Sequence, residues 1–266
     1  MPSLDCRLIV DEPAEGAWNM AVDEALLESA IGGGPATLRV YRWEPTLSLG
    51  YFQSYADRAN HPTSTGLPCV RRSSGGGALI HDLELTYSLT LSPDDFAKLK
   101  LPYPLYCAAH RAVIAAVVEL GGVAERLTLC NPDADAPAAE EPFLCFLRRA
   151  DGDLLVGPPH PGAVHGQPVY DRYMVAGSAQ RKSRGALLQH GGVLLGQSPA
   201  APELPGLSDL GLLPEQAPQF AQTLIRNLAE GLNLRLSAAA LEANERERAN
   251  RLREEKHAAR EWIEKR

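Results

Sequence analysis

The first ninety residues contain a series of short apolar segments separated by turn-forming residues, which is a pattern typical of β-strands. The strands that this pattern predicts are Cys6–Val10, Leu38–Trp43, Thr46–Gln53, Cys69–Arg72, Ala78–His81 and Glu84–Leu91. In the last of these segments apolar residues alternate with polar ones, which indicates that one face of the strand is buried. This part of the chain is therefore expected to form a sheet.

Two further pairs of strands are predicted in the second half of the chain. Phe143–Phe146 has the composition of a strand, and Asp153–Val156 is its expected hairpin partner. Arg172–Gln180 and Ala186–Gly191 are most simply explained as a second pair.

Three segments instead have apolar residues at helical spacing. The helix Ala17–Ser29 is expected to end at Gly32–Gly34, and Pro104–Leu120 is the most apolar segment and should lie in the core. A third helix is predicted around Leu224 and should end at Gly231. The number of helices and strands agrees with an α/β (α+β) fold.

Four residues on these helices carry groups that are capable of chemistry. Asp23 and Glu24 are expected to lie on a solvated face of the first helix, and Cys107 and His110 are expected to be structural members of the second.

The C-terminal segment differs from the rest in composition. Ser237–Arg266 is alanine-rich and charged, with pairs such as Glu242 and Arg246 four residues apart, and predicts a solvated helix. Its few apolar residues can dock on the body of the protein, and they are Leu241, Leu252, Trp262 and Ile263. We therefore expect a catalytic domain of residues 1–236 followed by a charged helix of residues 237–266. The segment of residues 157–171, rich in proline and glycine, is expected to be an inserted surface loop.

Composition excludes several classes of function. The formal net charge of the 266 residues is −7, which argues against nucleic acid as the main partner. Five cysteines without C-x-x-C spacing argue against a disulfide framework and a zinc site, and His160 and His165 have no visible partner ligands, so no metal is predicted. No apolar run approaches the ~20 residues that a membrane span needs. The first residues also lack the pattern of a signal peptide, so we expect a cytoplasmic protein without a membrane partner.

The segment Gly75-Gly76-Gly77 is the strongest candidate for a binding loop. Glycines without Cβ atoms allow a ligand to approach the backbone, and their N–H groups can bind a carboxylate, a phosphate or an acyl carbonyl. Arg71-Arg72 before the loop and His81-Asp82 after it favour this role over a simple hairpin tip. The spacing matches neither a P-loop nor a dinucleotide-binding motif.

The chain from Arg71 to Ser88 resembles the signature R-R-x-[ST]-G-G-[GR]-A-x-x-H-D, followed by L-x-Y-S, of the biotin/lipoate protein ligase family. Asn19–Leu26 is similar to the family's N-M-A-x-D-E-A-L helix, and Leu47–Gln53 to its S-L-G-x-x-Q strand. Gly177–Gln180 and Gln189–Gly191 resemble its G-S-A-Q and L-x-H-G motifs. The resemblance covers nearly the whole chain apart from the predicted insertion.

The resemblance implies a catalytic domain with mixed β-sheets flanked by helices, the fold of class II aminoacyl-tRNA synthetases and biotin ligases. It also implies a set of substrate-binding residues, which are Arg71, Arg72, Ser74, Gly75, Gly76, Gly77, Ala78, His81, Gly50, Tyr51, Gly177, Ser178, Ala179 and His190. Gly50 is expected to let the acyl chain pass close to the backbone.

Enzymes of the family join a medium-chain acyl group to a lysine of a small acceptor domain. The octanoyltransferase branch carries its nucleophile in a Cys-Phe pair upstream of the G-S-A-Q motif, and Cys145-Phe146 stands in that place here. The resemblance then implies octanoyl-acyl carrier protein as donor and a lipoyl domain as acceptor, in the glycine cleavage H protein or a 2-oxoacid dehydrogenase E2. A thioester donor already stores the energy of the reaction, so this route needs no cofactor.

Other interpretations remain open. Cys145 can be a buried structural thiol, because free cysteine is among the most buried residue types. An ATP-dependent lipoate-protein ligase, which requires ATP and magnesium, is the second hypothesis, and a non-catalytic binder of acyl groups or lipoyl domains is the third. A biotin ligase is disfavoured, because the chain has no G-R-G-R-x-G segment.

One position departs from the family pattern. Met174 stands where the family's G-x-K-[VI]-x-G motif has a lysine that contacts the reacting carbonyl. A positioned acid or base typically contributes 10²–10⁴-fold to a rate. Either Lys182, Arg181 or His81 takes over this role, in which case we select Lys182 as the catalytic partner of Cys145, or the activity is weak.

Overall fold

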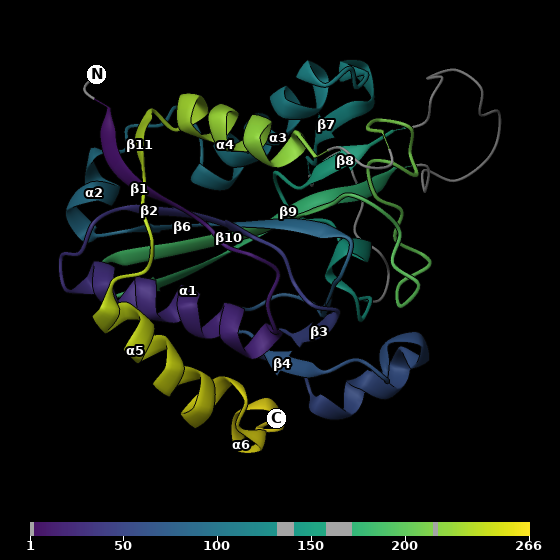
Figure 1. Cartoon of the computed structure of the whole chain (residues 1–266). Helices are drawn as coiled ribbons and strands as arrows, with labels where there is room; N and C mark the ends of the chain where they lie inside the picture. Colours follow the sequence, from purple (N-terminus) through teal and green to yellow (C-terminus); the bar gives the residue numbers. More distant parts are fainter. Residues whose placement is uncertain (1–2, 132–140, 158–171, 215–217) are drawn as a thin grey trace.

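A mixed sheet of eight strands forms the centre of the computed structural model, which describes residues 3–131, 141–157, 172–214 and 218–266 (Figure 1). The strand order is β11-β1-β2-β6-β10-β9-β8-β7. β11, β1 and β2 are parallel, and every later neighbour pair from β2 to β7 is antiparallel. The strands of this sheet are β1 (Leu4–Val10), β2 (Thr37–Tyr41), β6 (Glu84–Leu91), β7 (Leu127–Leu129), β8 (Leu154–Val156), β9 (Tyr173–Ser183), β10 (Ala186–Leu194) and β11 (Leu234–Ala238).

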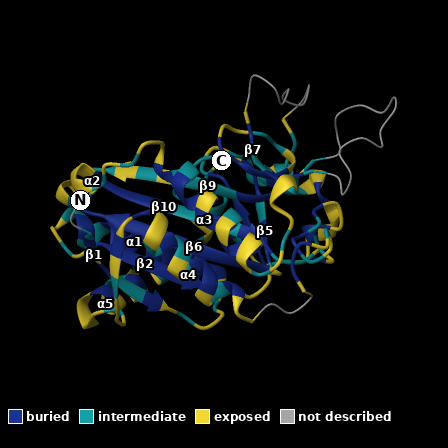
Figure 2. Ribbon diagram, turned by 90° about the horizontal axis from the view of Figure 1, so that it is seen from above, coloured by how far each residue is buried: buried dark blue, intermediate teal, exposed yellow. Residues whose placement is uncertain are grey.

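Helices cover both faces of this sheet. α3 and α4 lie against one face, and α1 and α5 lie against the other (Figure 1). The helices are α1 (Gly16–Ile31), α2 (Pro93–Lys98), α3 (Leu105–Glu119), α4 (Phe220–Gly231), α5 (Ala243–Leu252) and α6 (Arg260–Ile263). Because the sheet is covered on both sides, its central strands are buried along most of their length (Figure 2). No helix of the described residues is both long enough and apolar enough to cross a membrane.

A smaller sheet of three strands carries the glycine loop. Its order is β4 (Cys69–Arg71), β3 (Thr46–Leu49), β5 (Leu79–His81), with β3 parallel to β4 and antiparallel to β5. The loop joins β4 to β5 across the end of β3. The fold class is therefore confirmed: mixed sheets are flanked by helices, and each strand predicted in the first ninety residues is present, although some of the bounds differ.

β3 is shorter than the strand predicted for Thr46–Gln53. The chain turns after Leu49, and the turn is held by the Gln53 N–H, which donates to Gly50 O at 3.1 Å. The side chain of Gln53 accepts from the Gly50 N–H at 2.9 Å. The pattern of apolar residues cannot indicate this turn, because the turn is held by the polar side chain of Gln53.

The hairpin predicted for Phe143–Phe146 and Asp153–Val156 is wrong. Both edges of β8 are occupied by β7 and β9, so β8 has no free edge for a further strand. Residues Cys145–Leu147 instead form the short 3-10 helix η4, next to a single bridge between Leu144 and Ala78. Leu144 and Phe146 are buried against the small sheet.

The C-terminal segment docks on the body through apolar residues, as expected, but it is not one continuous solvated helix. The expected boundary between residues 236 and 237 falls inside β11, which pairs with β1. Ala249 and Leu252 of α5 pack against the apolar side of α1. After α5 the chain continues through a π-helical turn, η5 (Arg253–His257), into α6. The segment thus belongs to the body of the catalytic fold.

Most of the predicted insertion, residues 158–171 with His160 and His165, lies outside the described residues. The segment Asn131–Glu141, rich in alanine, aspartate and proline, is predicted to be a loop from its composition, and most of it also lies outside the described residues.

Candidate functional site

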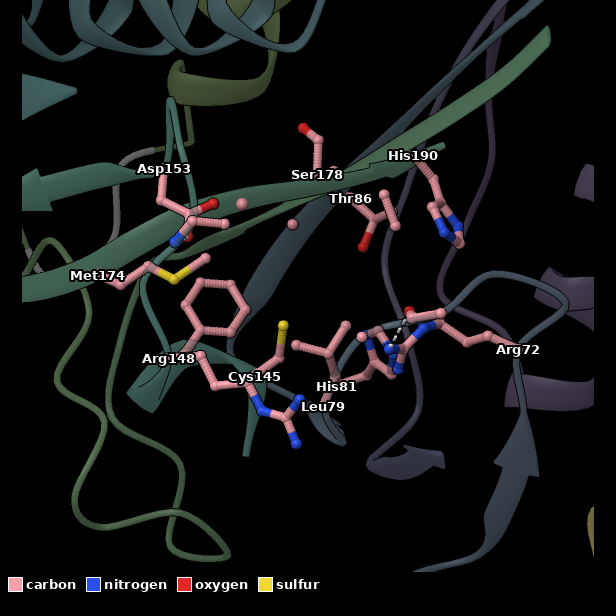
Figure 3. Close-up of a pocket in the computed structure, with 18 of the residues that line it drawn as sticks. Arg72, Leu79, His81, Thr86, Cys145, Arg148, Asp153, Met174, Ser178 and His190 are labelled. Atoms are coloured by element: carbon pink, nitrogen blue, oxygen red, sulfur yellow. Dashed lines mark hydrogen bonds between the residues drawn. The ribbon is translucent and has the colours of Figure 1, made fainter. Parts of the chain in front are cut away.

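A cavity of about 500 Å³ lies where the glycine loop, η4 and the strands β9 and β10 meet (Figure 3). Nine of the predicted site residues line it: Arg72, Gly75, Gly76, His81, Cys145, Gly177, Ser178, Ala179 and His190. Segments that are far apart in the sequence therefore contribute to one site.

Cys145 is held against the glycine loop by the backbone. The Cys145 N–H donates to Ala78 O at 2.8 Å, and the Arg148 N–H donates to Cys145 O at 2.8 Å. A Cβ added to Gly76 would lie 3.7 Å from Cys145 Sγ. The thiol is half-buried and faces the cavity (Figure 3).

Glycine is required at two points of this contact. Gly76 has a φ of +96°, a conformation that residues with a Cβ rarely adopt. A Cβ on Gly50 would collide with the carbonyl oxygen of Gly76. Gly50 therefore leaves room for the loop, and not for an acyl chain as the sequence suggested.

Arg72 fixes the shape of the loop. Its buried guanidinium donates to Gly77 O at 2.7 Å, to Gly75 O at 3.2 Å and to Ser48 Oγ at 2.8 Å. Its Nη2 atom would lie 3.4 Å from a Cβ on Gly76, close to the point that Cys145 Sγ also approaches. A fixed positive charge is thus adjacent to the thiol.

His81 is locked by its neighbours. Its ring stacks on Trp43 with centroids 3.8 Å apart, Nε2 bonds Ser48 Oγ at 2.7 Å, and Nδ1 bonds Glu84 Oε1 at 2.6 Å. Both ring nitrogens are therefore engaged within the protein.

His190 closes the other side of the loop. Its Nε2 lies 2.9 Å from Ser74 Oγ, and its Nδ1 lies 3.8 Å from a carboxylate oxygen of Asp23. Burial lowers the pKa of His190 to about 4, so its ring is neutral at neutral pH. Ser74 is thereby tied to β10.

Ser178 is anchored toward α3. Its Oγ hydrogen-bonds Tyr87 Oη at 2.7 Å and His110 Nε2 at 2.8 Å, and His110 Nδ1 bonds Gly152 O at 2.6 Å. The structural role predicted for His110 is consistent with these contacts. The hydroxyl of Ser178 supports the cavity wall.

Three residues expected to bind substrate have structural contacts instead. The Arg71 guanidinium donates to Gln53 O at 2.7 Å and to Ile263 O at 2.7 Å, which ties β4 to the C-terminal segment. Gly50 packs under the glycine loop as described above. The Tyr51 ring lies tilted against Trp262 with centroids 5.9 Å apart, and Lys265 Nζ lies 3.5 Å from the centroid of the Tyr51 ring. None of these contacts faces the cavity, and the sequence could not distinguish them from ligand contacts.

Lys182 does not reach the cavity either. It pairs with Leu187 across β9 and β10, and Leu187 packs in the core on the α3 side of the sheet. Its ammonium lies 5.6 Å from the centroid of Phe96 on α2. At ~3.3 Å per residue of strand, Lys182 lies roughly 26 Å along β9 from Met174. Its selection as the catalytic partner of Cys145 is therefore not supported by the geometry.

Met174 does lie in the cavity, next to a residue that the sequence analysis did not select. Met174 Cε and Asp153 Oδ1 both approach the position of a Cβ on Gly177, the oxygen at 3.5 Å (Figure 3). Asp153 is buried, and burial raises its pKa to about 7. The sequence showed Asp153 only as the first residue of a strand, and no local motif marks it.

Asp23 and Glu24 are buried, which contradicts the expected solvated face of α1. Asp23 accepts from Arg39 Nη1 at 3.0 Å and from Tyr41 Oη at 2.8 Å. Glu24 accepts from Lys256 Nζ and from His257 Nε2 at 2.7 and 2.8 Å. The cationic partners of these two carboxylates offset the free-energy cost of burying their charges.

Within the described part of the chain, no group of three or more His, Cys, Asp or Glu side chains is arranged to hold a metal ion.

Comparison with known proteins gives consistent matches. Residues 15–201 match the family model of the lipoyl protein ligase A/B catalytic domain. A protein named octanoyltransferase LipM from Kyrpidia tusciae is 31% identical over 96% of this chain and 97% of its own length. A protein of the same name from Brevibacillus brevis is 35% identical over 71% of this chain and 65% of its own length.

Solved structures share the fold. A lipoate protein ligase of T. acidophilum with bound lipoic acid superposes with a TM-score of 0.73 at 21% identity, covering 99% of this chain and 100% of that one. A lipoate-protein ligase A bound with ATP gives a TM-score of 0.73 at 21% identity, covering 98% of this chain and 99% of the other. At this level of identity the likeness concerns the fold alone.

Proposed function

Because the chain belongs to the lipoyl protein ligase A/B catalytic domain family, we propose that it is an octanoyltransferase of protein lipoylation. In this proposal octanoyl-acyl carrier protein is the donor, Cys145 carries the acyl group as a thioester, and a lysine of a lipoyl domain is the acceptor. The single observation that carries the proposal is the position of Cys145 Sγ, which faces the cavity beside the glycine loop.

The cavity suits an acyl chain of medium length. Leu79, Phe146 and Met174 contribute apolar side chains to its wall. Each CH₂ group removed from water contributes about 0.8 kcal/mol, so an octanoyl chain gains several kcal/mol of binding free energy there. The thioester carbonyl would then lie near the thiol and the charge of Arg72.

The first half-reaction transfers the acyl group to the enzyme. Sγ of Cys145 attacks the thioester carbonyl of the donor, the carbon–sulfur bond to the carrier breaks, and the carrier sulfur takes the proton of the thiol. One thioester replaces another, so the step is close to thermoneutral. The guanidinium of Arg72 stabilises the negative charge that develops on the carbonyl oxygen.

In the second half-reaction the acceptor amine attacks the acyl-Cys145 carbonyl. An amide forms, and the thiol of Cys145 is regenerated. The amide is more stable than the thioester, so the reaction proceeds without ATP or magnesium. The acceptor lysine enters through the same cavity that received the donor.

The test is a comparison of two substrate sets with a lipoyl domain as acceptor. Octanoyl-acyl carrier protein alone should give octanoylated lipoyl domain with a chelator present, whereas free octanoate with ATP and magnesium should give none. The opposite result would identify an ATP-dependent ligase. No product from either set, together with retained binding of the lipoyl domain, would identify a non-catalytic binder.

A further inference from the structure

Asp153 is an ionisable side chain of the cavity wall that the reaction described above does not use. Asp153 lies immediately before β8, and its carboxylate points into the cavity beside Met174, on the side away from His190 (Figure 3). We propose that Asp153 accepts the proton that the acceptor lysine must lose before it attacks acyl-Cys145. This inference rests on the octanoyltransferase proposed above.

The hydrogen bonds of Asp153 leave one oxygen available. Oδ2 accepts from the Ala150 N–H at 2.8 Å, which fixes the orientation of the carboxylate. Among the described residues Oδ1 has no hydrogen-bond partner, and it is the oxygen that approaches the Gly177 position on the cavity wall. A proton acceptor needs this combination of a fixed group and an open lone pair.

No cation is paired with this carboxylate within the described part of the chain. Arg149 is the nearest candidate in sequence, but its guanidinium donates to Phe146 O, Arg148 O and Arg172 O. Burial without an ion pair disfavours the charged form of a carboxyl group, so the carboxylate of Asp153 has a raised affinity for a proton.

The surroundings of Asp153 support this role. Burial raises the pKa of Asp153 to about 7, and the Ala150 N–H and Arg149 only partly oppose that shift. The ionisable groups packed around it are Arg149 and Asp151 on its own segment, Tyr106, Cys107 and His110 on α3, and Cys145 and Arg148 across the cavity. A proton acceptor with a pKa near the working pH is the most effective kind.

The other bases of the cavity are less suitable. Both nitrogens of His81 are bonded within the protein, and Nε2 of His190 is bonded to Ser74. The low pKa of His190, about 4, makes it a weaker proton acceptor than Asp153.

The proposed step balances as follows. The ammonium of the acceptor lysine gives one proton to Asp153, and the resulting amine forms a bond to the acyl carbon of Cys145. The carbon–sulfur bond breaks, and the second nitrogen proton passes to the departing sulfur. Asp153 later releases its proton to solvent.

The substitution Asp153→Asn tests this role, because it keeps the size of the side chain and an oxygen for the Ala150 N–H but cannot take up a proton. Single-turnover kinetics separate the two half-reactions. We expect acylation of Cys145 within about twofold of wild type and transfer to the lipoyl domain slowed roughly 10²-fold or more. The wild-type transfer rate should rise with pH through about pH 7, and the variant should lack that limb.

Asp151→Asn is the matched control, because Asp151 lies two residues away and accepts from Tyr106 Oη at the surface. It should transfer at the wild-type rate. Thermal unfolding at pH 8 checks that the variants fold. Asp153→Asn should be at least as stable as wild type at this pH, because a buried carboxyl group with a raised pKa makes the folded protein less stable as the pH rises.

Two results would overturn the inference while leaving the transferase intact. One is transfer by Asp153→Asn at the wild-type rate, and the other is an equal loss in both half-reactions. If wild-type protein forms no acyl-Cys145 at all, the proposed function fails first and this inference with it.

Discussion

Individual residues decide how closely the reactive thiol and the glycine loop approach each other. Gly76 adopts a φ of +96° and faces Cys145, and Arg72 holds the carbonyl groups on either side of it. The sequence predicted these three residues because family motifs mark them. It did not predict Asp153, whose proton affinity depends on burial by segments that are distant in the chain.

The substitution Gly76→Val should abolish acylation of Cys145. A branched side chain at this position would fill the space between Arg72 Nη2 and Sγ, and its backbone conformation would cost about 1–3 kcal/mol. Mass spectrometry after mixing with octanoyl-acyl carrier protein measures the acyl group, and thermal unfolding measures the stability.

Gly66→Val is the control for this experiment, because a Cβ at Gly66 meets no atom within 4 Å. It should retain acylation and stability. Normal acylation of Gly76→Val would show that the loop does not contact the acyl group.

The substitution Lys182→Met should change the transfer rate less than twofold, because Lys182 lies on the α3 side of the sheet. Steady-state transfer to a lipoyl domain measures this effect. A loss of tenfold or more would place Lys182 in the reaction and would contradict the geometry.

At the scale of elements, the apolar pattern of the sequence predicts a helix or strand well where only one face of that element is buried. α1 is different, because the sheet covers one side of it and α5 with η5 covers another. Glu24 therefore lies inside a cluster with Lys256, His257 and Arg181, although its sequence context is that of a surface residue. The predicted strand at Phe143–Phe146 failed for a related reason, because pairing depends on which strand edges are free.

The substitution Glu24→Gln should destabilise the fold by roughly 3 kcal/mol at neutral pH, because it leaves the half-buried cations Lys256 and Arg181 without their counter-charge. Burial alone would raise the pKa of Glu24, but hydrogen bonds from His257 and Lys256 lower it strongly. A lowered pKa stabilises the folded state above the unfolded pKa of about 4.5. This contribution disappears as the pH falls below that value, so wild type and variant should converge in acid.

Urea unfolding at several pH values measures this difference. Glu28→Gln is the control on the same helix, because its pair with Arg248 is exposed and contributes less than about 1 kcal/mol. Equal effects of the two substitutions at pH 7 would show that the Glu24 cluster does not hold α1 to the C-terminal segment.

At the scale of the whole molecule, two sheets bring together four separate parts of the chain. The glycine loop and η4 meet through the bond from Cys145 N–H to Ala78 O, and β9 and β10 complete the wall. The sequence motifs predicted which segments take part. Their distances, and the exclusion of Lys182, follow only from the register of β9 against β10.

The central claim is that Cys145 carries the acyl group. The most direct measurement is the intact mass of the protein after mixing with octanoyl-acyl carrier protein without ATP. We predict a gain of one octanoyl group that hydroxylamine removes, and no gain in Cys145→Ser, while Cys107→Ser acylates normally. An acyl group that persists in Cys145→Ser, or that disappears in another cysteine variant, would contradict the account.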